Sequence, residues 1–490
     1  MSAKHESRGV SFNPRWAELR LLLLSAVVLA ITLSNLDIES FKMFGWVIGG
    51  YIGVFTLAHV ALCFVAPRAD QIMLPVAAAL NALGLVIIYR LNPNLAAKQV
   101  MWALLAVVMM VVLLFILRDH RSLGRFSYIL GLLGLVLLAL PMVWPTSMDA
   151  DANIWISIGP FSVQPGEFSK ILLLLFFAQL LVNKRALFTV AGYHFMGMEF
   201  PRLRDLGPIL LVWAVALMIM AGENDFGPAL LLFGTVLGML FLATGRVSWL
   251  LIGVVLVAIG GTGVYQISSK IQARVQNFIN PFDNYDSAGY QLSQALFGLN
   301  FGGVSGTGLG KGYPNEVPVA VSDFILAAVG EELGMVGLAA ILMLFAIFIT
   351  RGMRVALQCR DSFGKLVASG LSLTIAIQVF VVVGGISALL PMTGLTTPFM
   401  SAGGSSLLAN YMLLAIILRI SDAATPLPHT RVPVLTRHWG LLLARYRPRL
   451  EVHDESFYPF DVPVYAADEC GAAGQPDVCA GLFGLCGRSA

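Results

Sequence analysis

Three carboxylates stand at the beginning and in the interior of one long apolar stretch, VPVAVSDFILAAVGEELG. A charged side chain in hydrocarbon costs about 3 kcal/mol or more unless it is hydrated, paired or functional. Asp323, Glu331 and Glu332 therefore mark the part of the chain where we expect its chemistry. A carboxylate at the outer end of an apolar helix, as Asp323 is, can take the proton of an attacking hydroxyl group. A purely structural role, with Asp323 beginning the helix and Ser322 capping it, is the alternative.

The two glutamates lie deeper than Asp323. They follow it by eight and nine residues, which places them about 12 Å further along a helix that rises about 1.5 Å per residue. Glu331 and Glu332 either line a water-filled cavity or pair with a cation on another membrane span. Pairing is the favoured interpretation, because an unpaired charge at that depth is costly.

A second polar group precedes another apolar stretch, in WISIGPFSVQPGEFSK. Glu167 and Lys170 are three residues apart on one face of the expected helix, and this spacing permits an ion pair. Lys170 could instead bind an anionic group of a substrate, and the sequence does not decide between the two roles. Gln164 stands just before the helix and is a candidate contact at the same surface.

These residues must be positioned by membrane-spanning helices. The chain has 490 residues, of which 58% are hydrophobic and 12% charged, and its mean hydropathy is +0.81. About 20 apolar residues cross the hydrocarbon core of a bilayer. Runs of about this length predict an all-α polytopic membrane protein of about twelve transmembrane helices, near residues 18–36, 43–66, 71–91, 99–117, 125–145, 168–186, 206–221, 226–244, 247–267, 323–350, 363–390 and 400–421.

The loops between these spans predict the orientation. Lysine and arginine gather in cytoplasmic loops, and here the alternate loops 146–167 and 391–399 contain neither residue. This bias places both termini in the cytoplasm and the large loop 268–322, between the ninth and tenth spans, outside. Residues 1–422 form the membrane domain, and residues 423–490, which are poor in apolar periodicity, are expected to be a partly disordered cytoplasmic tail.

Four separated motifs carry a resemblance to a known family. They are the run from RVQNF to GLGKG that leads into SDFILAAVGEELG, the WISIGPFSVQPGEFSK stretch, ENDFG, and PMTGLTTPFMSAGGSS. In their order and spacing they resemble the SEDS family (shape, elongation, division and sporulation), the group of RodA and FtsW, and they look closer to the RodA side. The resemblance covers about residues 125–421. Members typically have ten spans, so it implies two additional N-terminal spans here.

The resemblance implies an enzyme of the bacterial plasma membrane that polymerises lipid II into peptidoglycan glycan strands. It implies a class B penicillin-binding protein as partner, together with membrane lipids. Asp323 matches the essential aspartate of the family, and joining sugars by displacing a diphosphate requires a base of this kind. No cofactor is assigned, and a divalent cation stays an open alternative.

Cations and anion-binding groups would serve the diphosphate leaving group of such a reaction. Arg274, which opens RVQNF, is the first candidate, although an arginine reaching for lipid headgroups would have the same position. Lys311 follows in the glycine-rich run, which is not a P-loop because no Ser or Thr follows its Gly-Lys. Ser405 and Ser406 begin the last span, where backbone N–H groups could bind an anion or small residues could simply pack helices.

Two other functions stay open beside the polymerase. A flippase for the same lipid would also need many spans with internal charges, but no inverted repeat is visible, and the candidate residues concentrate in one outer loop. A scaffold that only holds a penicillin-binding protein would not need the external carboxylate and cations. Nucleic-acid binding is not indicated by the net charge of +3, because basic loops at a membrane attract anionic lipid headgroups. The cysteines match no zinc-binding spacing, so no metal ligands are predicted.

Overall fold

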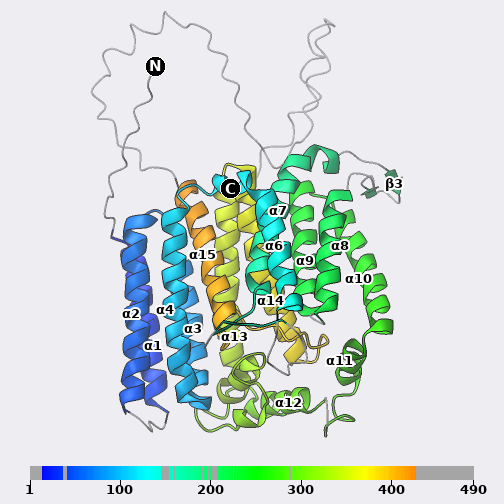
Figure 1. The fold of residues 1–490 in the computed structure, drawn as a ribbon. Coiled ribbons are helices and arrows are strands. Elements are labelled where there is room, and N and C mark those ends of the chain that lie inside the picture. The colour runs from blue at the N-terminus through cyan, green and yellow to red at the C-terminus, as the bar shows by residue number, and fades with distance from the viewer. Residues whose placement is uncertain are drawn as a thin grey trace, which may run out of the picture. The chain divides into compact units, whose positions relative to one another are not determined.

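The computed structural model describes residues 14–36, 41–144, 154–158, 161–189, 193–195, 198–200, 207–223, 226–286 and 289–425. Within them, ten helices are long and apolar enough to cross a membrane (Figure 1). They are α1 (Trp16–Ser34), α2 (Phe41–Val65), α3 (Met73–Leu91), α4 (Pro93–Ile116), α7 (Gly166–Thr189), α9 (Phe226–Thr244), α10 (Ser248–Ile267), α13 (Ile325–Gln358), α14 (Ser362–Ile386) and α15 (Gly404–Ala424).

The remaining described elements are short. Two further apolar helices are α6 (Ser127–Val143) and α8 (Gly207–Gly222). The others are α5 (Arg121–Arg125), α11 (Ser269–Ile279), α12 (Tyr290–Gly302), the 3-10 turn η2 (Pro314–Glu316), and the antiparallel hairpins β1 (Ile156–Ile158) with β2 (Phe161–Val163) and β3 (Tyr193–Phe195) with β4 (Met198–Phe200).

The prediction of an all-helical polytopic membrane protein is confirmed. Ten of the twelve predicted spans coincide with helices long enough to cross a membrane, and the other two coincide with the shorter apolar helices α6 and α8. Helices prevail because only they and closed barrels satisfy every backbone group in lipid. The predicted tail lies outside the described residues from 426 onward, as does Asp225 of the ENDFG motif.

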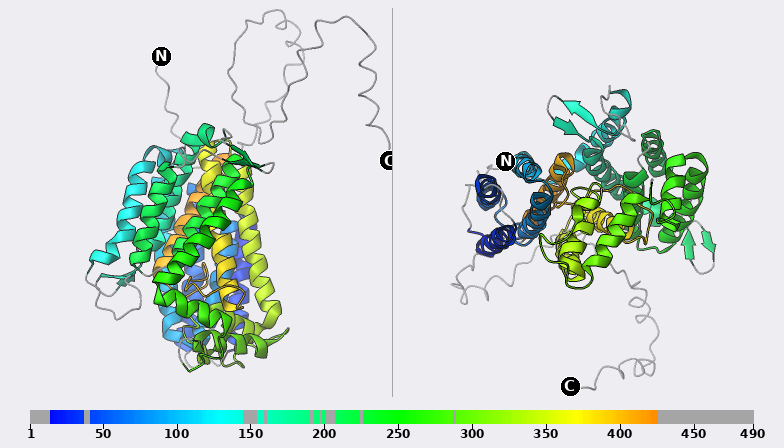
Figure 2. Two further views of the ribbon diagram at one scale, coloured as in Figure 1. Left: turned by 90° about the vertical axis from the view of Figure 1, so that its right-hand side faces the viewer. Right: turned by 90° about the horizontal axis from the view of Figure 1, so that it is seen from below.

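The helices form two groups with three helices between them. Helices α1 to α4 lie on one side and α6 to α10 on the other, and α13, α14 and α15 lie between the groups in Figure 1 and in the view from below in Figure 2. Helix α13 packs on α14 and α3, α15 packs on α4, and α14 packs on α7 and α9. The central helices therefore touch both groups.

The large loop before α13 is more ordered than an irregular loop. It contains the amphipathic helix α11 and the helix α12, and α12 packs on α13. Helix α13 is interrupted at Gly334, whose φ is +65°, and the glycine-rich turn after α12 supplies hydrogen bonds at this break. Thr307 N–H donates to Glu331 O at 3.0 Å, and Met335 N–H donates to Gly303 O at 3.0 Å. Backbone groups that the break releases are therefore satisfied by the loop itself.

An extended segment between α14 and α15, residues 387–403, lies among the helices and is called here the linking segment. Its residues Phe399 and Ser401 are buried, so their backbone carbonyls need partners. Asn81 of α3 donates to Phe399 O at 3.1 Å, and Gln99 of α4 donates to Ser401 O at 3.0 Å. Polar side chains in otherwise apolar spans therefore hold this segment inside the protein.

Gly84 of α3 permits the closest approach of the linking segment to a helix. A Cβ atom at this position would lie 2.3 Å from the Met400 carbonyl oxygen, so we expect Gly84→Ala to displace the segment and to destabilise the protein by about 1–3 kcal/mol, as overpacking does. Gly49→Ala is the matched control, because a Cβ at Gly49 of α2 meets nothing within 4 Å. Thermal unfolding of both purified variants tests this, and equal midpoints would show that the contact is not constrained.

Candidate active site

Asp323 lies two residues before the first residue of α13 and is half-buried. The N-cap position of α13 is Phe324, without a side-chain cap, and the Ser322 hydroxyl donates to Val319 O instead. The alternative that Ser322 caps this helix is therefore wrong. The backbone before Asp323 is bonded to the linking segment, since Ala402 N–H donates to Val321 O at 2.8 Å and the Ser401 hydroxyl to Ser322 O at 2.6 Å.

Arg274 reaches the same segment from α11. Its Nη1 donates to Thr393 O at 3.3 Å. The next residue, Gly394, has a φ of +75°, and a Cβ atom there would lie 3.6 Å from Arg274 Nη2 and 3.7 Å from Asp323 Oδ2. The structure thus brings the Asp323 carboxylate and the Arg274 guanidinium group to the same residue of the linking segment, Gly394, which is exposed.

Glu167 and Lys170 form the ion pair that their spacing permits, with 2.7 Å between Lys170 Nζ and Glu167 Oε2. Both side chains are buried in α7. Lys170 also lies 3.5 Å from the Gln378 side-chain oxygen, and the Gln378 amide donates to Thr396 O at 2.7 Å. The pair is therefore connected to the linking segment two residues beyond Gly394.

A cleft opens beside this pair. Its polar lining includes Gln164, Glu167, Lys170 and Glu223, and Leu395 of the linking segment forms part of its wall. Leu395 directly follows Gly394 in the chain, so neighbouring residues of the linking segment contact the cleft and the Asp323–Arg274 pair. The accessible volume of this cleft is about 10 Å³, room for about one water molecule, so an anionic group would meet the Lys170 cation only after the cleft widens.

Ser405 and Ser406 are engaged by the protein itself. The Ser405 hydroxyl accepts a hydrogen bond from Gln164 N–H at 2.9 Å, and the Ser406 hydroxyl lies 2.9 Å from that of Thr396. Both serines are buried. They connect the start of α15 to the β2–α7 turn and to the linking segment, and their predicted contact with substrate stays a prediction.

Lys311 lies apart from the other candidates. It lines a second cavity of about 350 Å³ together with Tyr313 and Glu331, and neither Asp323 nor Arg274 belongs to the lining. Glu331 accepts a hydrogen bond from Tyr313 N–H at 2.5 Å. The two predicted roles are lining a cavity and pairing with a cation on another span. Glu331 has the first role, and Glu332 has the second, because it pairs with Arg90 of α3 at 3.4 Å.

Sequence reasoning did not single out Gln378 or the carbonyls of Thr393 and Thr396. A glutamine inside an otherwise apolar span is an available signal, since buried polar groups in membranes are costly and need partners. The backbone carbonyls leave no such signal, because their role depends on where the linking segment lies.

The arrangement combines a half-buried carboxylate with a guanidinium group and places a buried ammonium group in an adjacent cleft. A carboxylate can accept a proton from a hydroxyl nucleophile, and cations stabilise a departing anion. The fold and the site therefore define a polytopic membrane protein suited to group transfer from an anionic leaving group at one end of its helix bundle.

Comparison with known proteins agrees with this class. The FtsW, RodA and SpoVE family, described as cell cycle proteins, matches residues 70–425. The peptidoglycan glycosyltransferase RodA of Mycobacterium leprae is 49% identical over 438 residues, which cover 86% of this chain and 94% of the relative. The chain therefore belongs to the FtsW, RodA and SpoVE family, which is the SEDS family.

Solved structures share the fold. One chain of a peptidoglycan synthase complex, described as coordinating polymerization and crosslinking, aligns with a TM-score of 0.60 and 26% identity over 73% of this chain and 98% of that chain. The rod shape determining protein RodA of Thermus thermophilus aligns with a TM-score of 0.51 and 24% identity over 73% of this chain and 98% of that chain.

The Glu167–Lys170 pair yields a test that separates structure from substrate contact. Either single charge reversal leaves a buried like-charge pair, and breaking a buried pair costs about 3–5 kcal/mol. We expect the double variant Glu167→Lys with Lys170→Glu to regain most of the thermal stability, yet to polymerise at least about 100-fold more slowly, as when a donor to a developing anion is removed. Recovery of activity together with stability would reduce Lys170 to its ion pair.

Proposed function

We infer that this chain is a peptidoglycan glycosyltransferase, the activity named for its mycobacterial relative, and we propose that it polymerises lipid II with Asp323 as the general base. The observation that carries the proposal is the placement of Asp323 and Arg274 on Gly394. This placement puts a proton acceptor and a cation beside the same exposed glycine.

In the proposed reaction, a hydroxyl oxygen of one disaccharide attacks the anomeric carbon of another. The new glycosidic C–O bond forms while the bond from that carbon to the polyprenyl diphosphate breaks. Asp323 accepts the hydroxyl proton, and the diphosphate leaves with the bonding electrons. The positive charge of Arg274 offsets the negative charge that grows on the leaving group, which is the electrostatic role that cations play in such transition states.

Lys170 is proposed to contact the anionic part of the lipid once the cleft beside it, whose volume is about 10 Å³, has widened. Lys170 is held by Glu167 at 2.7 Å and lies near Gln378, so the ammonium group is oriented before substrate arrives. Gln164 at the mouth of the cleft is proposed as a further contact, and Ser405 holds the Gln164 backbone in place. Lys311, in the separate cavity, is proposed to contact a different part of the substrate.

We further propose twelve membrane crossings, with α6 and α8 included, in the bacterial plasma membrane and with both termini cytoplasmic. The distribution of lysine and arginine supports this topology. It places Asp323 and residues 268–322 outside, where lipid II would be polymerised. A class B penicillin-binding protein is the proposed partner, supported by the similarity to a chain of a synthase complex.

Asp323→Asn tests the catalytic proposal. Asparagine is nearly isosteric but cannot accept the proton, and loss of a general base typically costs about 10² to 10⁴-fold in rate. We expect a folded protein that still binds lipid II and makes no visible glycan polymer when it is purified and incubated with labelled lipid II. Polymer at a near wild-type rate would contradict the mechanism.

The same assay, run in vesicles, separates the polymerase from a flippase. A flippase does not depend on a proton acceptor at this face, so lipid translocation by the unmodified protein without any polymer would favour that alternative.

Labelling with a membrane-impermeant maleimide tests the topology. Asp286 and Arg360 are both exposed, and they lie before and after α13. We expect Asp286→Cys to react in intact cells and Arg360→Cys to react only after permeabilisation, because one is proposed to be outside and the other inside. Both variants carry Cys470, Cys479 and Cys486 replaced by serine, and the remaining native cysteines Cys63 and Cys359 are buried and should contribute little signal. The reverse pattern would invert the orientation.

A further inference from the structure

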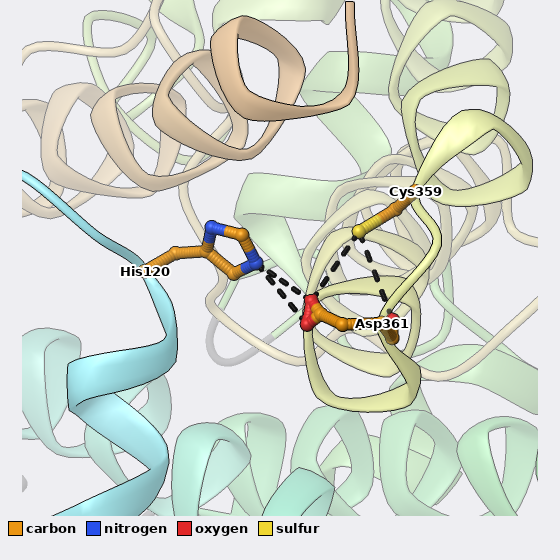
Figure 3. Close-up of side chains that lie close together, drawn as sticks. All are labelled: His120, Cys359 and Asp361. Carbon is orange, nitrogen blue, oxygen red and sulfur yellow. Dashed lines mark hydrogen bonds and ion pairs between the residues drawn. The ribbon is translucent and has the colours of Figure 1, made fainter. Parts of the chain in front are cut away.

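A second cluster of reactive side chains lies at the opposite end of α13 from Asp323. Cys359 directly follows α13, Asp361 directly precedes α14, and His120 directly precedes α5. Figure 3 shows the three side chains directed toward one another from two separate turns of the chain. In the topology proposed above, this end is cytoplasmic.

The three groups present their ligand atoms to a common space. The His120 Nε2 atom lies 2.7 Å from Asp361 Oδ2 and 3.2 Å from Asp361 Oδ1, and Cys359 Sγ lies 3.5 Å from Asp361 Oδ2. One ligand atom from each residue lies within 4.8 Å of the others. A Cβ atom on Gly364 would be 2.6 Å from both His120 Nε2 and Asp361 Oδ2 and 2.8 Å from Cys359 Sγ, so glycine leaves open the space that they face.

The chemistry of this set is specific. Sulfur of cysteine, nitrogen of histidine and oxygen of a carboxylate are the ligand types of zinc. With bonds of about 2.0–2.3 Å and tetrahedral angles, such ligands lie about 3.5 Å apart. Asp361 Oδ2 lies 3.5 Å from Cys359 Sγ and 2.7 Å from His120 Nε2, so an ion would replace the His120–Asp361 hydrogen bond and widen that distance by about 0.8 Å. Three protein ligands leave a fourth position for water.

The second nitrogen of His120 provides an independent observation. His120 is only 3% exposed, and its Nδ1 atom has no hydrogen-bond partner, which is costly for a buried polar atom. The nearest carboxylate is that of Asp119, 3.7 Å from Nδ1. A histidine that binds a metal through one nitrogen characteristically directs its other N–H to a carboxylate, and Asp119 is placed for that role.

We propose that His120, Cys359 and Asp361 bind Zn²⁺ or a similar borderline divalent transition-metal ion. The ion would connect the turn between α4 and α5 to the turn between α13 and α14. Since α13 carries Asp323 before its first residue, this connection fixes the far end of the helix that positions the proposed base.

In the metal-free protein the cluster is held by hydrogen bonds. Burial, and then the adjacent Asp361 carboxylate, raises the pKa of the Cys359 thiol to about 12. Burial also acts to raise the pKa of Asp361, but the hydrogen bond and charge of His120 outweigh it, so the pKa of Asp361 falls below its usual range. Binding of the ion would release the thiol proton and form the metal–sulfur bond.

The experiment uses the full chain, carrying no histidine tag, with Cys63, Cys470, Cys479 and Cys486 replaced by serine. Cys359 is then the only cysteine of the original five. Titration with Co²⁺ should produce the thiolate-to-cobalt charge-transfer band in the near ultraviolet, saturating at one ion per chain. Added Zn²⁺ should displace the cobalt and abolish the band, and it should raise the midpoint of thermal unfolding.

Two ligand variants and one control make the test decisive. Cys359→Ser should abolish the band, and Asp361→Asn, which can still cap α14, should weaken cobalt binding by more than the 10 to 100-fold that loss of an outer-shell partner costs. The control is a matched chain that retains Cys63 and carries Cys359→Ser. Cys63 also lies beside a histidine, with its Sγ 3.7 Å from His59 Nε2, yet this chain should show no band.

Polymerisation of labelled lipid II in membranes, or a monodisperse elution profile if the protein proves not to be a polymerase, verifies folding. A folded single-cysteine protein without the band, or equal metal affinity in Asp361→Asn, would overturn the proposal, whatever the outcome of the Asp323 experiment.

Discussion

The structure depends on the irregular backbone of the linking segment, whose residues 397–401 are buried and only in part bonded helically, as from Ser401 N–H to Thr397 O. The buried N–H and C=O groups of this segment need partners inside the protein, because hydrocarbon offers none. Asn81 and Gln99 from the N-terminal group of helices and Gln378 from α14 supply partners for three of its carbonyls. The need to satisfy this backbone therefore fixes α3, α4 and α14 relative to one another.

The same backbone arranges the proposed catalytic groups in order. Arg274 donates to Thr393 O, Gly394 lies against Asp323, and Thr396 O accepts from Gln378, which lies beside Lys170. Three residues within the short run 393–396 thus connect a guanidinium group, a carboxylate and a buried ammonium group that come from three different helical regions. Preorganised charges cost no rearrangement during a reaction. A linking segment held in one conformation would therefore keep the proposed catalytic groups in the positions that the reaction requires.

Helix α13 relates the two ends of the protein. It begins at the proposed base, is interrupted at Gly334 where the glycine-rich turn bonds to its backbone, and ends at Cys359 beside the proposed metal site. Glu331 and Glu332 stand just before the break, one bonded to Tyr313 N–H and the other paired with Arg90. These contacts join α13 to the outer loop and to α3, so the position of Asp323 is set by interactions along the first third of the helix.

The sequence by itself determined the features that arise from nearby residues. Apolar runs of membrane length located the helices, the spacing of Glu167 and Lys170 implied their ion pair, and Asp323 stood out as a carboxylate at the end of an apolar stretch. Only the tertiary structure decided which distant groups meet. It placed Arg274 beside Asp323, separated Lys311 into another cavity, paired Glu332 with Arg90, and joined His120 to Cys359. The physical reason is that hydrophobic periodicity and i, i+3 spacing are local properties, whereas contacts between spans depend on how the helices pack around the linking segment.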